Sequence, residues 1–396
     1  MSALRFWLWL STAEVSLRTK ARVLEKYADA ETAFMASGGE LAALEGISLK
    51  DARTLELHRQ ADMGAIEEEC AVQGIKLLTI QDAAYPQRLK NIFAPPPVLY
   101  VKGELPAVDE NPLIAVVGTR SASAYGLKMG KNIAYEIAQA GGIVVSGLSS
   151  GIDVQAAHGA LLAGGRCVSV LGTPHEVENR LAADVAAHGA LISEYAPGTL
   201  PQRSFFRDRN RISAGLSVGV VAIEAPERSG VLLFVNEAAE QGKEIFALPS
   251  NADSPTGAGT NALIRDGARL VTCGWDVMSE FAGRFPERIS KPEGQSPPAE
   301  EKSAENLEKK KSDDKKVIDK ENGRAYIDWK EQLAALSEEQ LRIITAIDKG
   351  GSHIDDIIEN TGLSAPKVLA QLTVLEIRGF VRRAAGKRFL LNTVKK

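Results

Sequence analysis

The chain has 396 residues, a formal net charge of −4 and a hydrophobic content of 44%. Because single cores stop growing at about 250–300 residues, this length predicts several domains, each with an ordinary globular core. The slight acidity excludes a uniformly basic nucleic-acid-binding protein, so any contact with nucleic acid has to come from local clusters.

The cysteines and the first apolar run indicate the compartment. The three cysteines lie far apart and form no CxxC pair, which argues against a disulfide framework and against a zinc site. The apolar residues 6–10 are too few for a signal peptide or a membrane span. We therefore expect a cytoplasmic protein that does not contact a membrane.

Residues 1–103 are predicted to form a mostly helical domain. Apolar side chains recur at helical spacing in residues 21–27 and 41–44. Residues 44–48 resemble the hairpin of a helix-hairpin-helix or SAM-like domain, although a glycine that ends a helix explains Gly46 equally well. The prolines at positions 95–97 then force an extended approach to the next domain.

Residues 104–287 follow a different pattern, in which short apolar runs alternate with helical stretches. The predicted strands span residues 113–117, 143–146, 167–171, 190–193, 218–223, 245–247 and 269–271. Strands that are apolar on both faces and alternate with helices are typical of a parallel sheet covered on both sides. The fold class is therefore α/β, a Rossmann-like, doubly wound, mostly parallel sheet.

Two further segments complete the chain. Residues 288–330 are rich in Lys, Glu, Asp, Ser and Pro, which predicts a disordered charged linker. Within residues 331–396, Ser337 begins a capping box, two more helices follow, and apolar runs on both sides of Gly386 predict a hairpin. Three helices and a hairpin are typical of a winged-helix domain.

The first strand of the predicted sheet leads into a turn that suits phosphate binding. The turn and the approach to the next helix contain Gly118, Thr119, Arg120, Ser121 and Ser123. Glycine permits close backbone approach, the helix N-terminus offers N–H groups, and Arg120 adds a guanidinium. The motif is not GxGxxG and no acidic residue follows the second strand, so we expect no nicotinamide cofactor. A plain strand–helix turn is the alternative.

A second turn, rich in hydrogen-bond donors, follows the next strand. It contains Ser146, Gly147, Ser150 and Gly151. Because ligands of open α/β sheets bind beyond the carboxyl ends of the strands, this turn is expected beside the first. Asp153 is interpreted as a cap of the following helix, and His158 as a packed or surface residue.

A third cluster combines aromatic and cationic side chains. Its members are Phe206, Arg207, Arg209, Asn210 and Arg211. The combination suits a sugar–phosphate backbone with base stacking, although one arginine can instead pair with Glu194. Two glycine-rich loops, at residues 229–230 and 256–261, either line the same crevice or are ordinary turns.

The sequence contains no constellation typical of catalysis or metal binding. It lacks a GxxxxGK[ST] loop, a nucleophile elbow and a pair of carboxylates on a common loop. We therefore expect no catalytic residue, no cofactor and no bound metal.

In order and spacing, these motifs resemble the DNA-processing protein A family, DprA or Smf. The matching motifs are residues 116–121, 125–126, 146–147, 151–153, 157–158, 193–195, 209–212, 221–225, 229–230 and 259–261. The resemblance implies a cytoplasmic bacterial protein that binds and protects incoming single-stranded DNA in natural transformation. It further implies RecA loading, a homodimer formed through the Rossmann-like domain, and no enzymatic activity.

Carried over residue by residue, the resemblance assigns roles around a pocket. Arg120 is expected to contact phosphate, Gly147 and Gly151 to form a wall, and Arg209 and Arg211 to shape or line it. Three positions depart from the family pattern. They are Ser150 in place of a basic residue, the loop 172–180, and Arg207 in place of a proline. Arg180 and Arg207 are expected to restore positive charge to the rim.

The predicted winged helix carries a secondary basic patch near its end. The patch consists of Arg378, Arg382, Arg383, Lys387 and Arg388. It suits contact with the backbone of duplex DNA, and docking of a protein partner is equally compatible.

Two other functions remain open on the sequence. Related Rossmann-like enzymes process nucleotides with a Pro-Gly-Gly-x-Gly-Thr loop followed by a glutamate, where this chain has residues 229–233 and then Glu237. A regulator that senses a nucleotide and binds duplex DNA through the winged helix is the other alternative.

Overall fold

The computed structural model describes residues 3–27, 29–175, 179–292, 338–347, 352–377, 381–384 and 388–391. The chain divides into two compact units, residues 1–302 and residues 303–396, and each is considered by itself.

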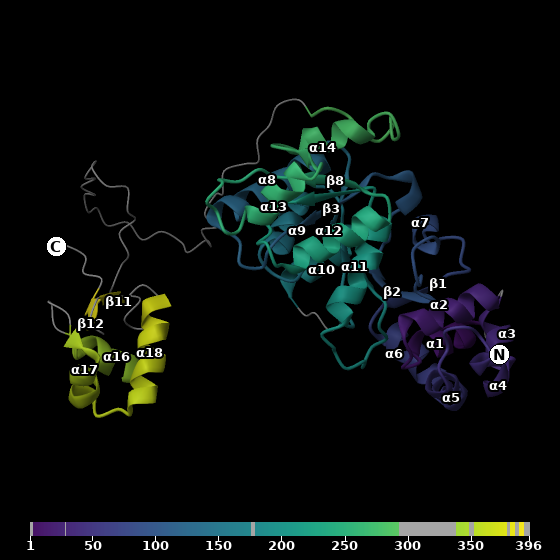
Figure 1. Cartoon of the computed structure of the whole chain (residues 1–396), viewed down its shortest axis with the longest axis horizontal. Coiled ribbons are helices and arrows are strands. Elements are labelled where there is room, and N and C mark those ends of the chain that lie inside the picture. The colour runs from purple at the N-terminus through teal and green to yellow at the C-terminus, as the bar shows by residue number, and fades with distance from the viewer. Residues whose placement is uncertain are drawn as a thin grey trace, which may run out of the picture. The chain divides into compact units, whose positions relative to one another are not determined.

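A sheet of nine described strands forms the centre of the first unit (Figure 1). Seven of them are β3 (Leu113–Val117), β4 (Ile143–Ser146), β5 (Cys167–Val170), β6 (Ala190–Ser193), β7 (Gly219–Ala222), β8 (Glu244–Ala247) and β9 (Arg269–Leu270). They lie in the order β6-β5-β4-β3-β7-β8-β9, and every neighbouring pair among them is parallel. The predicted doubly wound, mostly parallel sheet is thus confirmed.

Two strands that the sequence analysis did not predict extend this sheet. They are β1 (Ile75–Thr79) and β2 (Val98–Gly103). β2 pairs antiparallel with β6, with Tyr100 opposite Ser193, and β1 pairs antiparallel with β2. β2 follows the prolines at 95–97, so the extended approach expected there is itself a strand of the sheet.

Helices cover both faces of the sheet, and each face has its own apolar core. One face packs against α8 (Ala124–Gln139), α9 (Ile152–Leu162), α10 (Arg180–His188) and α14 (Gly274–Phe281). The other packs against α7 (Gln87–Lys90), η1 (Val108–Glu110), α11 (Phe205–Leu216), α12 (Gly230–Glu240) and α13 (Ala258–Arg265). Strands such as β3 and β4 are buried because both faces are covered.

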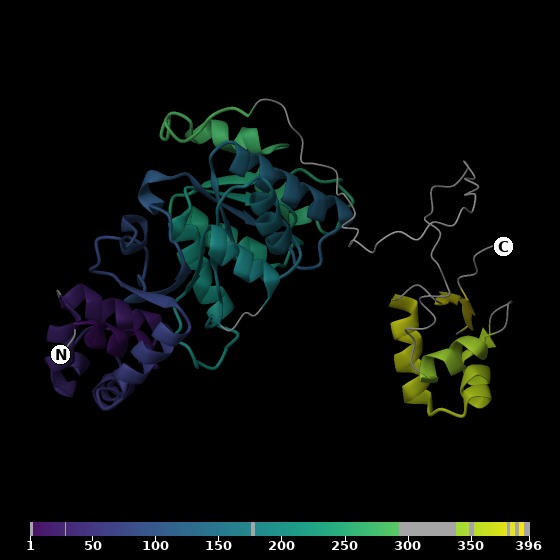
Figure 2. The same cartoon turned by 180° about the vertical axis from the view of Figure 1, so that it is seen from behind.

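Six short helices gather beside β1 and β2, as both views of the chain show (Figures 1 and 2). They are α1 (Leu4–Thr12), α2 (Leu17–Lys26), α3 (Ala30–Met35), α4 (Gly38–Ala42), α5 (Leu49–His58) and α6 (Met63–Val72). Their core includes Trp9, whose indole N–H donates to the Leu55 carbonyl at 3.0 Å. Val98 and Tyr100 of β2 belong to the same core, so these helices pack directly onto the sheet.

The second unit contains three described helices and a small sheet. Its elements are α16 (Glu338–Thr345), β10 (Ser352–His353), α17 (Ile354–Thr361), α18 (Ala365–Ile377), β11 (Val381–Ala384) and β12 (Arg388–Leu391). β12 lies between β10 and β11, and Ile343, Leu372 and Phe389 are buried in the core. The predicted three helices and hairpin are confirmed. Most of the predicted linker, from residue 293 onward, lies outside the described residues.

Candidate nucleic-acid interface

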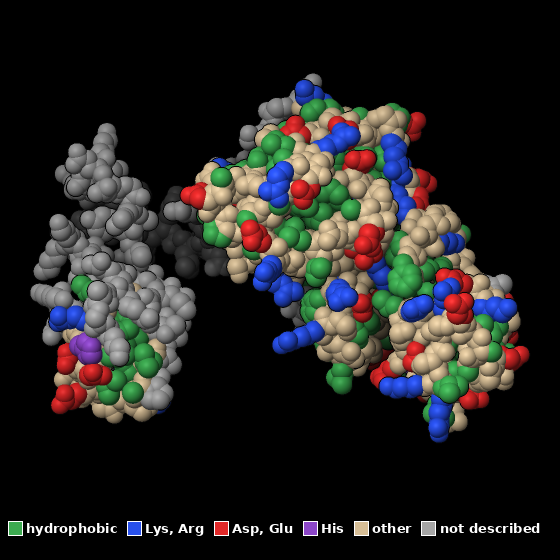
Figure 3. Space-filling model, in the orientation of Figure 1, with side chains coloured by type: hydrophobic (Ala, Val, Ile, Leu, Met, Phe, Trp, Pro, Cys, Tyr) green, Lys and Arg blue, Asp and Glu red, His purple; other side chains and the backbone are tan. Residues whose placement is uncertain are grey.

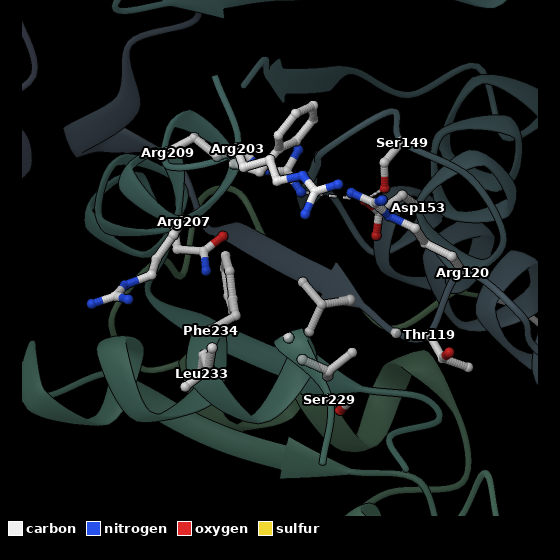
Figure 4. Close-up of a pocket in the computed structure, with 16 residues that line it drawn as sticks. Thr119, Arg120, Ser149, Asp153, Arg203, Arg207, Arg209, Ser229, Leu233 and Phe234 are labelled. Atoms are coloured by element: carbon white, nitrogen blue, oxygen red, sulfur yellow. Dashed lines mark hydrogen bonds and ion pairs between the residues drawn. The ribbon is translucent and has the colours of Figure 1, made fainter. Parts of the chain in front are cut away.

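A cavity of about 450 Å³ opens at the carboxyl ends of β3 and β7 (Figure 4). β3 pairs with β4 on one side and with β7 on the other, so the chain winds outward in both directions from this point. Such a topological switch point is where open α/β sheets bind ligands. Seven predicted site residues line the cavity: Gly118, Thr119, Arg120, Phe206, Arg207, Arg209 and Asn210.

Three exposed arginines give the cavity a cationic side. Arg120 follows β3, Arg203 precedes α11, and Arg207 lies in its first turn. In Figure 4, Arg120 and Arg203 extend toward each other across the cavity, whereas Arg207 points away from them. Elsewhere on the face of the first unit shown in Figure 3, cationic and acidic side chains are interspersed. The positive charge of the cavity is therefore a local feature of a slightly acidic chain.

The cavity also offers apolar and aromatic surface. Phe206 is 38% exposed, and the Cζ of Arg120 lies 5.5 Å from the centroid of its ring. The facing wall is the first part of α12, with Val231, Leu233 and Phe234. The site can thus hold an anionic group on one side and a flat apolar group on the other.

Arg209 lines the cavity but is held in place by the protein itself. Its side chain is 13% exposed, and its Nη1 donates to the carbonyls of Gly147 at 2.8 Å and Val170 at 3.1 Å. Its Nη2 lies 3.6 Å from Oδ2 of Asp153, whose side chain is 8% exposed. Burial lowers the pKa of Arg209, and the Asp153 carboxylate opposes this effect. Arg209 therefore positions the turn after β4.

This arrangement explains two residues of that turn. A Cβ at Gly147 would lie 2.0 Å from Nη1 of Arg209, so the arginine leaves room only for glycine. The helix α9 is preceded by Gly151, and Asp153 accepts from the Ser149 hydroxyl at 2.8 Å as well as pairing with Arg209. The prediction that Asp153 caps α9 is wrong, because its carboxylate is directed to these partners.

The start of α8 does not offer the free N–H groups that the sequence analysis expected. The backbone N–H of Ser123 donates to Oε2 of the buried Glu224 at 2.9 Å, and the Ser123 hydroxyl donates to Oε1. The N–H of Gly126 is capped by the Ser123 hydroxyl at 3.0 Å. At Gly118, a Cβ would lie 2.4 Å from Cγ1 of Ile152. Gly118 thus permits close packing against α9, and an internal carboxylate occupies the helix terminus.

The start of α12 lines the cavity as well as the first turn of α11. Ser229 and Gly230 line it, which decides the open question about this loop in favour of the crevice. The Ser229 hydroxyl is buried and has no hydrogen-bond partner among the described residues. The loop 256–261 is absent from the described lining, and Asn261 instead exchanges hydrogen bonds with the backbone of Ser250 at 3.0 Å.

Several predicted site residues lie outside the described cavity lining. They are Ser121, Ser123, Ser146, Gly147, Ser150, Gly151, Arg180 and Arg211. Arg211 is buried and pairs with Glu194, the alternative partner that the sequence left open. The Ser146 hydroxyl is also internal and donates to the Asp153 carbonyl at 2.8 Å. Arg211 and Ser146 are thus engaged inside the protein, whereas Ser121 and Arg180 are exposed, and the described lining does not include the Arg180 that was expected at the rim.

The sequence analysis missed Arg203. The residue lies four positions before Arg207, and its exposed side chain lines the cavity from the segment before α11. Because Arg203 lies before the first residue of α11, Phe205, helical spacing gave no signal for its place at the cavity.

The predicted basic patch of the second unit is only partly described. Arg388 is exposed on β12, and Arg382 and Arg383 lie on β11. Arg378 and Lys387 lie outside the described residues. The patch stays a prediction.

The described residues contain neither a cluster of metal ligands nor a helix that could cross a membrane. No group of three or more His, Cys, Asp or Glu side chains within them is arranged to hold a metal ion. None of the described helices combines the length and apolar character needed to span a bilayer.

Comparison with known proteins gives consistent matches in both units. Residues 76–282 match the family described as DNA recombination-mediator protein A, and residues 330–387 match the DprA winged helix domain. The chain is 39% identical over 217 residues to DNA processing protein DprA of Bacillus subtilis, covering 54% of this chain and 73% of the relative. It is 30% identical over 402 residues to Protein Smf of Synechocystis, covering 97% and 98%.

A solved structure agrees with these matches. The X-ray structure of DNA processing protein A from Streptococcus pneumoniae superposes with a TM-score of 0.61 at 32% identity. The match covers 69% of this chain and 96% of that one.

Proposed function

Because the chain belongs to the DNA recombination-mediator protein A family, called DprA or Smf in its relatives, we propose that it binds single-stranded DNA and helps load a RecA-type recombinase. Membership places the chain among DNA-processing proteins with a role in recombination. The observation that carries the DNA-binding proposal is the cationic side of the cavity. The carboxylate among its described lining residues, Asp153, is already paired with Arg209. The charges of Arg120, Arg203 and Arg207 are thus left for phosphates.

The preference for single strands follows from the other surfaces of the cavity. Phe206 presents an exposed ring, and the start of α12 presents an apolar wall. Such surfaces contact the faces of bases, which are accessible when the bases are neither paired nor stacked in a duplex. A cavity of about 450 Å³ holds a nucleotide-sized group and leaves no room for a duplex.

The remaining parts of the proposal rest on the family resemblance. They are a cytoplasmic location, protection of incoming DNA in transformation, assembly as a homodimer through the Rossmann-like domain, and action without catalysis. The winged helix is proposed to contact either duplex DNA or a protein partner. RecA loading is tested by following recombinase assembly on single-stranded DNA with and without this protein.

The DNA-binding proposal is tested by titrating single- and double-stranded oligonucleotides of one sequence against the full chain. The wild type is expected to prefer the single strand, and Arg120→Ala and Arg203→Ala are expected to weaken that binding. Arg166→Ala is the matched control, because this exposed arginine directly precedes β5, at the opposite end of the strands from the cavity. Unchanged affinity in both cavity variants would remove the proposed site.

A further inference from the structure

A smaller cavity, of about 280 Å³, lies between α2 and the loop that leads from α7 to β2. Its described lining consists of Arg18, Ala21, Arg22, Glu25 and Phe93. The residues from α2 are spaced three and four apart, so they share one face of that helix. None of the five belongs to the described lining of the cavity at the switch point. The two cavities are therefore distinct places on the first unit.

Phe93 presents an aromatic ring to solvent from a segment that is itself fixed. The residue is 63% exposed, whereas its neighbours Ile92 and Ala94 are buried. The Tyr85 hydroxyl donates to the Pro96 carbonyl at 2.9 Å and ties down the same segment. Ala94 has a φ of 49°, in the left-handed region that residues other than glycine rarely adopt. An exposed ring on a buried backbone is a platform on which a flat group can stack.

Arg18 supplies the cavity with a cation that is free to bind a ligand. Among the described residues, no carboxylate pairs with it. Its Nε lies 3.3 Å from the position that a Cβ would take on Gly46, so the side chain rests against the turn before α5. The Thr19 hydroxyl donates to Asp51 and fixes α2 to α5. The guanidinium of Arg18 is thus held in place by the fold and remains available to phosphate.

The other arginine of this cavity is only weakly engaged. Nη1 of Arg22 lies 2.6 Å from Oε2 of Glu25, and both side chains are exposed. An exposed pair of this kind is weak, so a phosphate can compete with Glu25 for Arg22. The described lining therefore carries two cations and one carboxylate, beside one exposed ring.

We propose that this cavity is a second contact for single-stranded DNA, in which a base stacks on Phe93 and a neighbouring phosphate binds Arg18. The inference rests on the proposed function, because it extends the same ligand onto the N-terminal helices. A flat ring beside a guanidinium matches a nucleotide, which joins a flat base to a phosphate. The cavity at the switch point shows the same combination in Phe206 and Arg120. An unpaired base is required, because pairing and stacking in a duplex hide the face that meets Phe93.

The first test is ultraviolet crosslinking of the full chain to oligothymidylates in which 5-iodouracil replaces thymine. Mass spectrometry of the peptides then locates the attached base. A crosslink at Phe93 is expected in the wild type and also in Arg120→Ala, Arg203→Ala, at a protein concentration that restores binding. A bound strand that gives no crosslink in the peptide containing Phe93 would overturn the proposal.

The second test separates the ring from the charge. Phe93→Leu removes the ring and is expected to weaken binding of long oligothymidylates about fivefold, whereas Phe93→Tyr is expected to bind as the wild type does. Arg18→Ala is expected to lower the log–log salt slope by about 0.7. Arg53→Ala, at an exposed position of α5 outside the cavity, is the matched control. Glu25→Gln is expected to tighten binding, because it releases Arg22.

The outcomes distinguish this cavity from the one at the switch point. If Phe93→Leu weakens binding while Arg120→Ala and Arg203→Ala do not, the present proposal stands and the cavity at the switch point is not the main site. Wild-type affinity and salt slope in both Phe93→Leu and Arg18→Ala would overturn the proposal and would leave the cavity to a partner other than DNA.

Discussion

Arg120, Arg203 and Arg209 line one cavity but have different roles. Arg120 and Arg203 are exposed, whereas Arg209 is enclosed by two carbonyls and the Asp153 carboxylate. An exposed arginine next to a cavity is available to a ligand, and an enclosed one is already committed to the protein. The residue types are therefore a poor guide to their roles until burial and partners are known.

Arg203 is predicted to contact a phosphate of single-stranded DNA. Arg203→Ala is expected to weaken binding of single-stranded DNA and to reduce the salt dependence of the binding constant, by about 0.7 in log–log slope for one lost phosphate contact. Fluorescence anisotropy over a range of salt concentrations measures both quantities. An unchanged slope would mean that Arg203 lines the cavity without contacting phosphate.

Arg209 is predicted to stabilise the folded protein. Arg209→Ala leaves the buried Asp153 without its cation, and breaking a buried pair in this way costs about 3–5 kcal/mol. Urea unfolding is expected to show this loss, whereas Arg207→Ala, at an exposed position beside it, is expected to change stability by less than about 0.5 kcal/mol. Adding Asp153→Asn to Arg209→Ala is expected to recover part of the loss. Wild-type stability in Arg209→Ala would refute the positioning role.

At the scale of elements, Glu224 ties the end of β7 to the start of α8. Its carboxylate accepts from the N–H and hydroxyl of Ser123, and its carbonyl accepts from the N–H of Thr119 at 2.9 Å. The turn that contains Gly118, Thr119 and Arg120 is thus fixed from the neighbouring strand. Glu224 thus fixes the backbone on both sides of Arg120.

Removing that contact is expected to cost stability. Glu224→Ala removes both hydrogen bonds from the half-buried Ser123, and each polar group left unpaired away from water costs about 1–3 kcal/mol. Thermal or urea unfolding measures the loss, and the exposed Glu227→Ala is the control. If stability stays at the wild-type level, water reaches the start of α8 and replaces the carboxylate.

The strands were largely predictable from the sequence, and the side-chain partners were not. β3 and β4 begin and end where their apolar runs predicted, because strands buried on both faces have a simple pattern. β1 and β2 were missed because neither pairing has a local signal. β1 pairs with β2 across the proline-rich segment, and β2 pairs with β6, which is distant in sequence. That Arg211 pairs inward and Arg203 lines the cavity depends on where α11 packs, which the local sequence does not state.

At the scale of the whole chain, the described lining of the cavity lies in the first unit. Every residue that lines it lies between residues 117 and 234, and the sheet and its two cores lie within residues 1–302. The second unit contributes none of the described lining. The proposed single-strand binding and the role of the winged helix can therefore be tested separately, by removing the second unit.

A fragment of residues 1–302 is expected to keep the single-strand affinity and salt slope of the full chain. Any duplex binding that the full chain shows is expected to be lost with the winged helix, since its basic patch is the proposed duplex contact. Parallel titrations of both proteins with single- and double-stranded oligonucleotides measure this. Loss of single-strand binding in a folded fragment would place the main DNA site outside the cavity.

The central claim is that the cavity at the switch point holds the phosphates of single-stranded DNA. The most direct measurement is the salt dependence of single-strand binding by the variant Arg120→Ala, Arg203→Ala, Arg207→Ala, beside Arg166→Ala and the wild type. The claim predicts a log–log slope lower by about 2 for the triple variant, three contacts at about 0.7 each, and an unchanged slope for Arg166→Ala. A folded triple variant with the wild-type slope and affinity would contradict it.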